Sequence, residues 1–256
     1  MKNIEHANGI ISYESEGQGI PVLFIHPPGM GSKVFEYQKA MKKDFRVIMP
    51  DFSGHGNSTN DIGESLIESY LEEIDMILKN EQLESAVLCG YSAGGMIAQS
   101  YTLKYPQKVE ALILSGGYPR VYTKSLDYQY MLGMKLLKSS PDTLAFLIAL
   151  SHAKTKSYRE SLVDHMKKSD LSVWLQFYEE TYLFDCVESL SAIKCPMLLM
   201  YGAKDFYSLP HKDFYERCGN LRMAIVSNSF HQLPTRKWES FNHIITDFIN
   251  KEISAN

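Results

Sequence analysis

The segment 90–94, Gly-Tyr-Ser-Ala-Gly, constrains the fold more than any other part of the chain, because it joins two different periodicities. The apolar run 85–89 before it is typical of a strand buried on both faces, and 96–105 after it has helical spacing that ends at Pro106. Glycines two residues before and after Ser92 let the flanking backbone pass closely. We therefore expect Ser92 in a tight strand-to-helix turn, at the carboxyl end of the strand.

Similar apolar runs recur along the chain and alternate with helical segments. Runs suited to strands lie at 21–25, 46–50, 109–114, 196–201 and 223–226, and apolar residues recur at helical spacing over 66–77 and 241–248. Such alternation implies parallel strands joined by right-handed crossovers. We expect an α/β fold, with a doubly wound, mostly parallel sheet and helices on both faces. A hairpin turn is predicted at Asn8-Gly9.

Strand patterns vanish between 118 and 190, where several helical segments take their place. One of these begins with Ser140 as a capping residue and Pro141 at the first helical position. We expect a core formed by 1–117 and 191–256, with 118–190 as a helical insertion.

Composition narrows the possible partners and compartments. The chain has 256 residues, a hydrophobic content of 45% and a net charge of −4 without Lys/Arg blocks, which argues against nucleic acid or membrane as the main partner. The four cysteines lack metal-ligand spacing, so we expect reduced thiols and no metal. No signal peptide or membrane span is recognisable. We expect a cytoplasmic monomer or homodimer that acts on a small molecule.

A serine hydroxyl is a weak nucleophile, so it needs a base, usually histidine, and a group that fixes the tautomer of that histidine. His231 directly follows the last predicted strand, 223–226, and should emerge at the same sheet edge as Ser92. Four other histidines are less well placed: His211 has no strand before it, His243 lies within the last helix, and the insertion holds His152 and His165. His231 is therefore the expected base.

The orienting carboxylate should also leave a strand end. Asp205 follows the run 196–201 after a short turn, whereas no acidic residue follows the strand that ends at Leu114. Asp51 also ends a strand, but the glycines and polar residues of 51–58, including His55, are typical of a structural turn. Asp205 is the expected partner of His231.

Four blocks, in order, resemble the α/β hydrolase superfamily over nearly the whole chain. They are the loop that begins at His26, the turn 51–58, the segment 90–95 with the strand that follows it, and the strand ends at Asp205 and His231. The order Ser, Asp, His is that of the superfamily. The resemblance implies that the insertion 118–190 is a helical cap over the active site.

Transition-state stabilisation requires two N–H donors for the developing oxyanion. In the families that this chain resembles, one donor follows the nucleophile, which corresponds to Ala93 here. The second comes from a loop that commonly reads His-Gly-x, but this chain has His-Pro-Pro-Gly-Met, and Pro28 at the aligned position has no N–H. We expect Gly29 to supply the second donor, with Met30 as the alternative.

These residues predict a cofactor-free, carboxylesterase-like hydrolase (EC 3.1.1 class) that cleaves an ester or related acyl bond through an acyl-enzyme. The insertion is rich in aromatic residues and methionine, which suits an apolar pocket. Candidate substrate contacts in and near it are Met30, Tyr91, Tyr118, Trp174 and Tyr178.

Three other functions use the same residues. They are an acyltransferase, a carbon-carbon bond hydrolase, and a small-molecule receptor or signalling protein whose hydrolysis is slow. A dehalogenase is disfavoured because the turn holds Ser92 rather than an aspartate.

Overall fold

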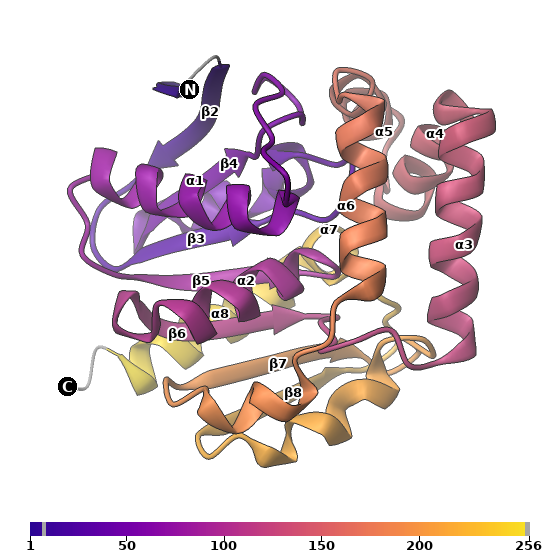
Figure 1. Cartoon of the computed structure of the whole chain (residues 1–256). Coiled ribbons are helices and arrows are strands. Elements are labelled where there is room, and N and C mark those ends of the chain that lie inside the picture. Colours follow the sequence, from indigo (N-terminus) through magenta and orange to yellow (C-terminus); the bar gives the residue numbers. More distant parts are fainter. Residues whose placement is uncertain (7–8, 254–256) are drawn as a thin grey trace.

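The computed structural model describes residues 1–6 and 9–253, and in it the chain forms an eight-stranded sheet (Figure 1). The strands are β1 (Lys2–His6), β2 (Gly9–Glu16), β3 (Pro21–Ile25), β4 (Arg46–Asp51), β5 (Ala86–Tyr91), β6 (Val109–Ser115), β7 (Met197–Gly202) and β8 (Leu221–Val226). Every run that the sequence analysis assigned to a strand is a strand. The strand boundaries shift by only a few residues.

The order of the strands is β1-β2-β4-β3-β5-β6-β7-β8. Strands β3 to β8 are mutually parallel, and β1 and β2 are antiparallel additions at one edge. This confirms the doubly wound, mostly parallel sheet. Asn8, in the predicted hairpin turn, lies outside the described residues, and His6 pairs with Gly9 across β1 and β2.

Helices cover both faces of the sheet, as the buried runs require. One face carries α1 (Leu66–Asn80) and α2 (Gly94–Lys104), and the other carries η1 (Ser32–Lys43), α7 (Leu233–Arg236) and α8 (Trp238–Glu252) (Figure 1). Alternate residues of one strand serve the two layers, since Leu23 packs in the cluster with α1 and α2 while Phe24 packs in the cluster with α8. This alternation explains why the strand runs are apolar throughout.

Four helices between β6 and β7, called the cap helices below, stand beyond the carboxyl ends of the parallel strands (Figure 1). They are α3 (Lys124–Ser139), α4 (Pro141–His152), α5 (Lys156–Met166) and α6 (Leu171–Leu183). The expected domain boundary at 190 falls within a short 3-10 helix, η3 (Val187–Ala192). Two further 3-10 helices, η2 (Pro106–Lys108) and η4 (Leu209–Arg217), belong to the layers of the core.

The start of α4 differs in one detail from the expectation. Ser140 occupies the N-cap position and Pro141 the first helical position, but the serine side chain makes no capping bond to a backbone amide. Its hydroxyl is 2.6 Å from Oγ1 of Thr143 instead. The backbone of Ser140, with φ −158° and ψ 74°, departs from the geometry of a usual N-cap, which accounts for the missing bond.

Hydrogen bonds fix the cap helices to the core at several points. Glu180 of α6 accepts from the backbone N–H groups of Leu66 at 2.7 Å and Ile67 at 3.0 Å, and so satisfies the free amides at the start of α1. Arg236 of α7 donates through Nε to the carbonyl of Ser151, at 2.8 Å, near the end of α4. These hydrogen bonds join α6 and the end of α4 to helices of the core. Within the described ranges, none of the helices combines the length and the apolar character needed to cross a bilayer.

Candidate active site

Ser92 lies in the turn between β5 and α2, with the backbone conformation that a nucleophile on such a turn requires. Its φ is +54°, in the left-handed region that few residues other than glycine adopt. A Cβ at Gly90 would lie 2.5 Å from the Cα of Gly95, and one at Gly94 would lie 2.3 Å from the carbonyl oxygen of Ile25. The two glycines are therefore required by close backbone contacts, and the strain at Ser92 is held by the packed strand and helix.

Asp205 and His231 meet at the same edge, at the ends of β7 and β8. Nδ1 of His231 is 2.8 Å from Oδ2 of Asp205, and the carboxylate also accepts from the hydroxyl and, at 3.1 Å, the N–H of Ser208. Burial raises the pKa of Asp205, but the charge of His231 and these hydrogen bonds outweigh burial and lower it. An ionised Asp205 holds the proton on Nδ1, which leaves the lone pair of Nε2 available for a proton.

Packing fixes the ring of His231 as well as its tautomer. The ring lies between Tyr91 and Tyr207, with centroid distances of 5.2 Å and 4.8 Å. Gly116 adjoins the third side, where a Cβ would lie 2.4 Å from Cε1 of the imidazole. Sequence reasoning did not identify Tyr207, Ser208 or Gly116 as parts of the site. The spacing from Asp205 to Ser208 was the one available signal, since an aspartate side chain often accepts from a backbone N–H a few residues later in a turn.

Ser92 and His231 line one cavity of about 600 Å³ between the sheet edge and the cap helices. Four of the predicted substrate contacts also line it, namely Met30, Tyr91, Tyr118 and Tyr178, together with Ala93. Much of the opposite wall is aliphatic and consists of Leu126, Leu132, Leu136, Leu144, Leu147 and Ile148. No Asp, Glu, Lys or Arg is among the described residues that line this cavity. The space is therefore apolar apart from a few uncharged polar groups.

The expectation that Trp174 contacts the substrate needs correction. Trp174 is only 1% exposed and does not line the cavity. Its ring packs under the loop after β3, where a Cβ on Gly29 would lie 2.1 Å from Cε2 of the indole. The indole of Trp174 thus packs against the loop after β3 and stabilises it.

The loop after β3 forms a tight turn in which the two prolines are accommodated. The N–H of Met30 donates to the carbonyl of Pro27 at 3.3 Å, and Gly29, with φ +79°, occupies the position that favours glycine in a type II turn. This bond engages the N–H of Met30, the alternative oxyanion donor. Gly29 itself does not line the cavity, and its carbonyl accepts from the hydroxyl of Ser169 at 3.2 Å. Ala93 does line it, immediately before the first residue of α2.

A family model described as serine aminopeptidase, S33, matches residues 22–236 of the chain. The chain belongs to this hydrolase family. It is 27% identical to the AB hydrolase superfamily protein YisY of Bacillus subtilis, with 98% of each chain covered. It is also 27% identical to a pimeloyl-[acyl-carrier protein] methyl ester esterase of Vibrio campbellii, with 91% of this chain and 89% of that one covered. The α/β hydrolase fold is shared with the esterase EaEST of Exiguobacterium antarcticum, at 20% identity and a TM-score of 0.85 over 94% of this chain and 96% of that one.

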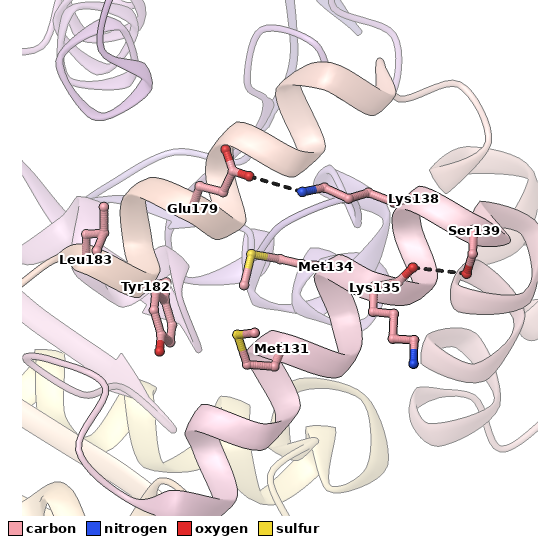
Figure 2. Close-up of a pocket in the computed structure, with 8 residues that line it drawn as sticks. All are labelled: Met131, Met134, Lys135, Lys138, Ser139, Glu179, Tyr182 and Leu183. Atoms are coloured by element: carbon pink, nitrogen blue, oxygen red, sulfur yellow. Dashed lines mark hydrogen bonds and ion pairs between the residues drawn. The ribbon is translucent and has the colours of Figure 1, made fainter.

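A second, larger cavity of about 770 Å³ lies on the outer side of this S33-family hydrolase, between α3 and α6 (Figure 2). Its side chains include Met131 and Met134, and Lys138 pairs with Glu179 across it at 3.6 Å (Figure 2). None of its described residues is part of a nucleophile and base arrangement like that of Ser92 and His231. The smaller cavity, which Ser92 and His231 line, is therefore the candidate active site.

Asp51 and His55 lie away from the cavity of the hydrolase. Asp51 accepts from the backbone N–H groups of Ser32 at 2.6 Å and Asn57 at 2.9 Å, and it pairs with Nε2 of His165 at 2.9 Å. The pKa of Asp51 is lowered because these interactions outweigh burial, which would raise it. Burial lowers the pKa of His55 to about 3, so this imidazole is neutral. Asp51 thus joins two loops, whereas Nδ1 of His55 is 3.0 Å from the hydroxyl of Tyr70 on α1.

His152 lines the cavity, although its place in the insertion gave no reason to expect this. Its Nε2 is 2.9 Å from the hydroxyl of Tyr91, and its Nδ1 is 2.8 Å from the carbonyl of Ile148. Burial lowers the pKa of His152 to about 4, so the neutral ring donates from Nδ1 and accepts from Tyr91. Tyr91, the residue before Ser92, is thereby hydrogen-bonded to α4 of the cap helices.

Proposed function

We propose that this hydrolase cleaves a carboxylic ester of a small, uncharged, largely apolar substrate, with Ser92 as the nucleophile. The observation that carries the proposal is the junction of a strained serine and a buried, carboxylate-bound histidine on one apolar cavity. An esterase among the relatives supports the same class of substrate. No cofactor is needed for this chemistry.

The reaction follows from the positions of the three side chains. His231 removes the proton from the Ser92 hydroxyl through Nε2 as the serine oxygen attacks the ester carbonyl, and Asp205 stabilises the resulting imidazolium. The N–H of Ala93, at the positive end of α2, donates to the developing oxyanion. His231 then protonates the leaving alcohol. A water molecule, deprotonated by the same histidine, releases the acid from the acyl-enzyme and restores the Ser92 hydroxyl.

The charge of the cavity favours an ester over a peptide with a free amino terminus. An aminopeptidase must bind a substrate ammonium, which in an apolar site requires a carboxylate. No carboxylate is among the described side chains on the cavity wall, and Asp205, the nearest one in the site, is engaged by His231 and Ser208. The aliphatic wall instead suits a hydrocarbon chain, because burial of each CH₂ stabilises the complex by about 0.8 kcal/mol.

A fluorophosphonate probe and a chain-length series of p-nitrophenyl esters test the proposal. We expect labelling at Ser92 and a maximum of kcat/KM at about four to eight acyl carbons, given a pocket of this size. A matched pair of esters, one ending in CH₃ and one in a carboxylate, should differ by about tenfold or more in favour of the neutral ester.

Ser92→Ala is the control, and it should abolish both labelling and turnover. Absence of ester hydrolysis by the wild type, or turnover that survives in Ser92→Ala, would contradict the proposal. Product analysis with an added alcohol or thiol separates a hydrolase from an acyltransferase. Loss of colour from a conjugated diketone would instead indicate carbon-carbon bond hydrolysis. Tight binding of a ligand with negligible turnover would indicate a receptor.

A further inference from the structure

The oxyanion site of this hydrolase is incomplete if it relies on backbone N–H groups alone. Ala93 supplies one donor beside Ser92, but Pro28 has no N–H, and the N–H of Met30 is bonded to Pro27. Gly29 is held against Trp174 and does not line the cavity. A second donor must therefore be sought among the side chains that surround Ser92.

Tyr118 is the hydroxyl-bearing residue best placed for this task. It follows the carboxyl end of β6, the strand that pairs with β5 next to Ser92, and it lines the cavity with Ser92 and Ala93. Tyr118 also packs in one cluster with Ala93, and only 1% of it is exposed. Its carbonyl is fixed by Nε2 of Gln99, at 3.1 Å. The side chain is thus anchored in the core and ends in the cavity.

The hydroxyl of Tyr118 belongs to a chain of hydroxyl groups that runs into the cap helices. It is 2.9 Å from the hydroxyl of Tyr130 on α3, which donates to Oγ1 of Thr181 on α6 at 3.2 Å. Thr181 in turn donates to the carbonyl of Phe177 at 2.5 Å. The last acceptor is fixed in a helix, so the chain holds the Tyr118 oxygen in place from behind.

The protonation state of Tyr118 suits a donor. Burial raises its pKa well above 10, and the interaction with the Ser92 hydroxyl acts in the opposite direction without overcoming burial. The phenol is therefore neutral and carries a proton at neutral pH. A rotation about the C–O bond carries this proton from Tyr130 toward the cavity, while Tyr130 keeps its own bond to Thr181.

We propose that the hydroxyl of Tyr118 is the second oxyanion donor, taking the place of the N–H that Pro28 lacks. As the Ser92 oxygen attacks, the substrate carbonyl oxygen becomes negative and accepts hydrogen bonds from the Ala93 N–H and the Tyr118 O–H. No proton is transferred to the oxyanion, and the hydroxyl returns to Tyr130 when the carbonyl re-forms. The assignment rests on the proposed ester hydrolysis at Ser92, and it adds a catalytic residue to that reaction.

Tyr118→Phe tests the assignment, because it removes one oxygen atom and keeps the ring packing. We expect kcat for a p-nitrophenyl ester to fall by about 10²–10³-fold, with KM changed by less than about threefold, since the bond forms in the transition state. Tyr130→Phe should have a smaller effect, since it keeps the donor and loses only its anchor. Tyr122→Phe, which removes a hydroxyl from a side chain that is 61% exposed and outside the cavity, is the matched control.

Inhibitor binding distinguishes a donor from a residue that only supports the fold. A trifluoromethyl ketone adds to Ser92 and forms a stable oxyanion, so its inhibition constant should rise in Tyr118→Phe by about the same factor as kcat falls. The methyl ketone of the same chain, which stays a neutral carbonyl, should bind equally well to both proteins. A kcat within about threefold of the wild type, or an unchanged inhibition constant for the trifluoromethyl ketone, would overturn the assignment and leave Gly29 as the donor.

The role of Tyr118 can also be tested if the proposed esterase activity is not found. If the wild type hydrolyses no ester, the rate at which a fluorophosphonate labels Ser92 still tests Tyr118, because attack on phosphorus also places negative charge on an oxygen. We expect labelling of Tyr118→Phe to be slower by about tenfold or more. Equal labelling rates would overturn the role of Tyr118 whether or not the protein is an esterase.

Discussion

The described part of the chain contains two buried aspartate–histidine pairs with nearly the same nitrogen–oxygen distance and different surroundings. His231 is 2.8 Å from Asp205, and His165 is 2.9 Å from Asp51. In both pairs the aspartate has a lowered pKa because its partners outweigh burial. Distance, burial and electrostatics therefore do not separate a catalytic pair from a structural one.

The two aspartate–histidine pairs differ in the groups that surround them. Among the described residues, the carboxylate of Asp205 bonds to Ser208 in its own loop and to His231, and His231 lines the cavity with Ser92. The carboxylate of Asp51 receives backbone N–H groups from two loops, and its histidine comes from cap helix α5. Nδ1 bonding leaves Nε2 of His231 available, whereas Nε2 of His165 is the atom bound to Asp51. In the proposed reaction the first pair supplies the base for Ser92, whereas the second pair joins cap helix α5 to the core.

The largest expected effect comes from removing each imidazole. His231→Gln should lower kcat by about 10⁴–10⁶-fold and change Tm little, because the proton acceptor for Ser92 is lost. His165→Gln should keep kcat within about threefold and lower Tm, because Asp51 loses the imidazole that lies 2.9 Å from its Oδ1. Ester turnover and thermal unfolding of both variants give the comparison. A catalytic loss in His165→Gln as large as that in His231→Gln would contradict the division of roles.

Replacing each aspartate by asparagine should also affect turnover in one pair and stability in the other. Asp205→Asn should lower kcat by about 10⁴-fold, because the amide no longer holds the proton on Nδ1. Asp51→Asn should leave turnover of the folded protein unchanged and destabilise it by about 3 kcal/mol, as expected for a buried pair that loses one partner.

The pH dependence of the unfolding free energy checks the destabilisation expected for Asp51→Asn. The folded-state pKa of Asp51 lies below its unfolded value, so the stability that it provides is present above about pH 4 and is lost as the pH falls below that value. The difference in unfolding free energy between the wild type and Asp51→Asn should therefore shrink in acid. A difference that is the same at pH 7 and pH 3 would argue against an ionised Asp51.

Glu73 is a buried carboxylate whose pKa shifts in the opposite direction. Glu73 on α1 is 1% exposed and accepts from the N–H of Ser53 at 3.0 Å, but burial dominates and raises its pKa to about 8. Between pH 4.5 and 8 the unfolded chain releases this proton while the folded protein keeps it, so stability falls as the pH rises.

Replacement of Glu73 by glutamine removes this penalty. Glu73→Gln should be more stable than the wild type at pH 8 by about 4 kcal/mol and nearly equal to it at pH 4.5. Thermal unfolding across this range measures the difference, and Glu72→Gln, at an exposed neighbouring position, is the control. Parallel curves for Glu73→Gln and the wild type would show that Glu73 is ionised in the folded protein.

The parts of the site that follow from local sequence were predictable, and those that depend on helix docking were not. The sheet and the strand ends that carry Ser92 and Asp205 follow from runs of apolar residues, because parallel strands end at one edge. The bond between Tyr91 and His152 joins residues 61 positions apart and depends on where α4 lies. Trp174 was misassigned for the same reason. Helical spacing indicates that a side chain is buried, but it does not show whether the ring faces a cavity or the Gly29 loop.

The smallest expected effect comes from removing a polar side chain that donates a hydrogen bond to each carboxylate. Ser208 donates its hydroxyl to Asp205, and the side-chain amide of Asn57 donates to Oδ2 of Asp51 at 3.2 Å. Each bond is worth about 1 kcal/mol, so Ser208→Ala should lower kcat by about fivefold to tenfold, because Asp205 then orients His231 less firmly. Asn57→Ala should instead lower the unfolding free energy by about 1 kcal/mol and leave kcat unchanged. If Ser208→Ala lost stability and kept its full turnover, Asp205 would need no support from Ser208 to orient the base, and the bond between them would serve the fold, as that of Asn57 to Asp51 does.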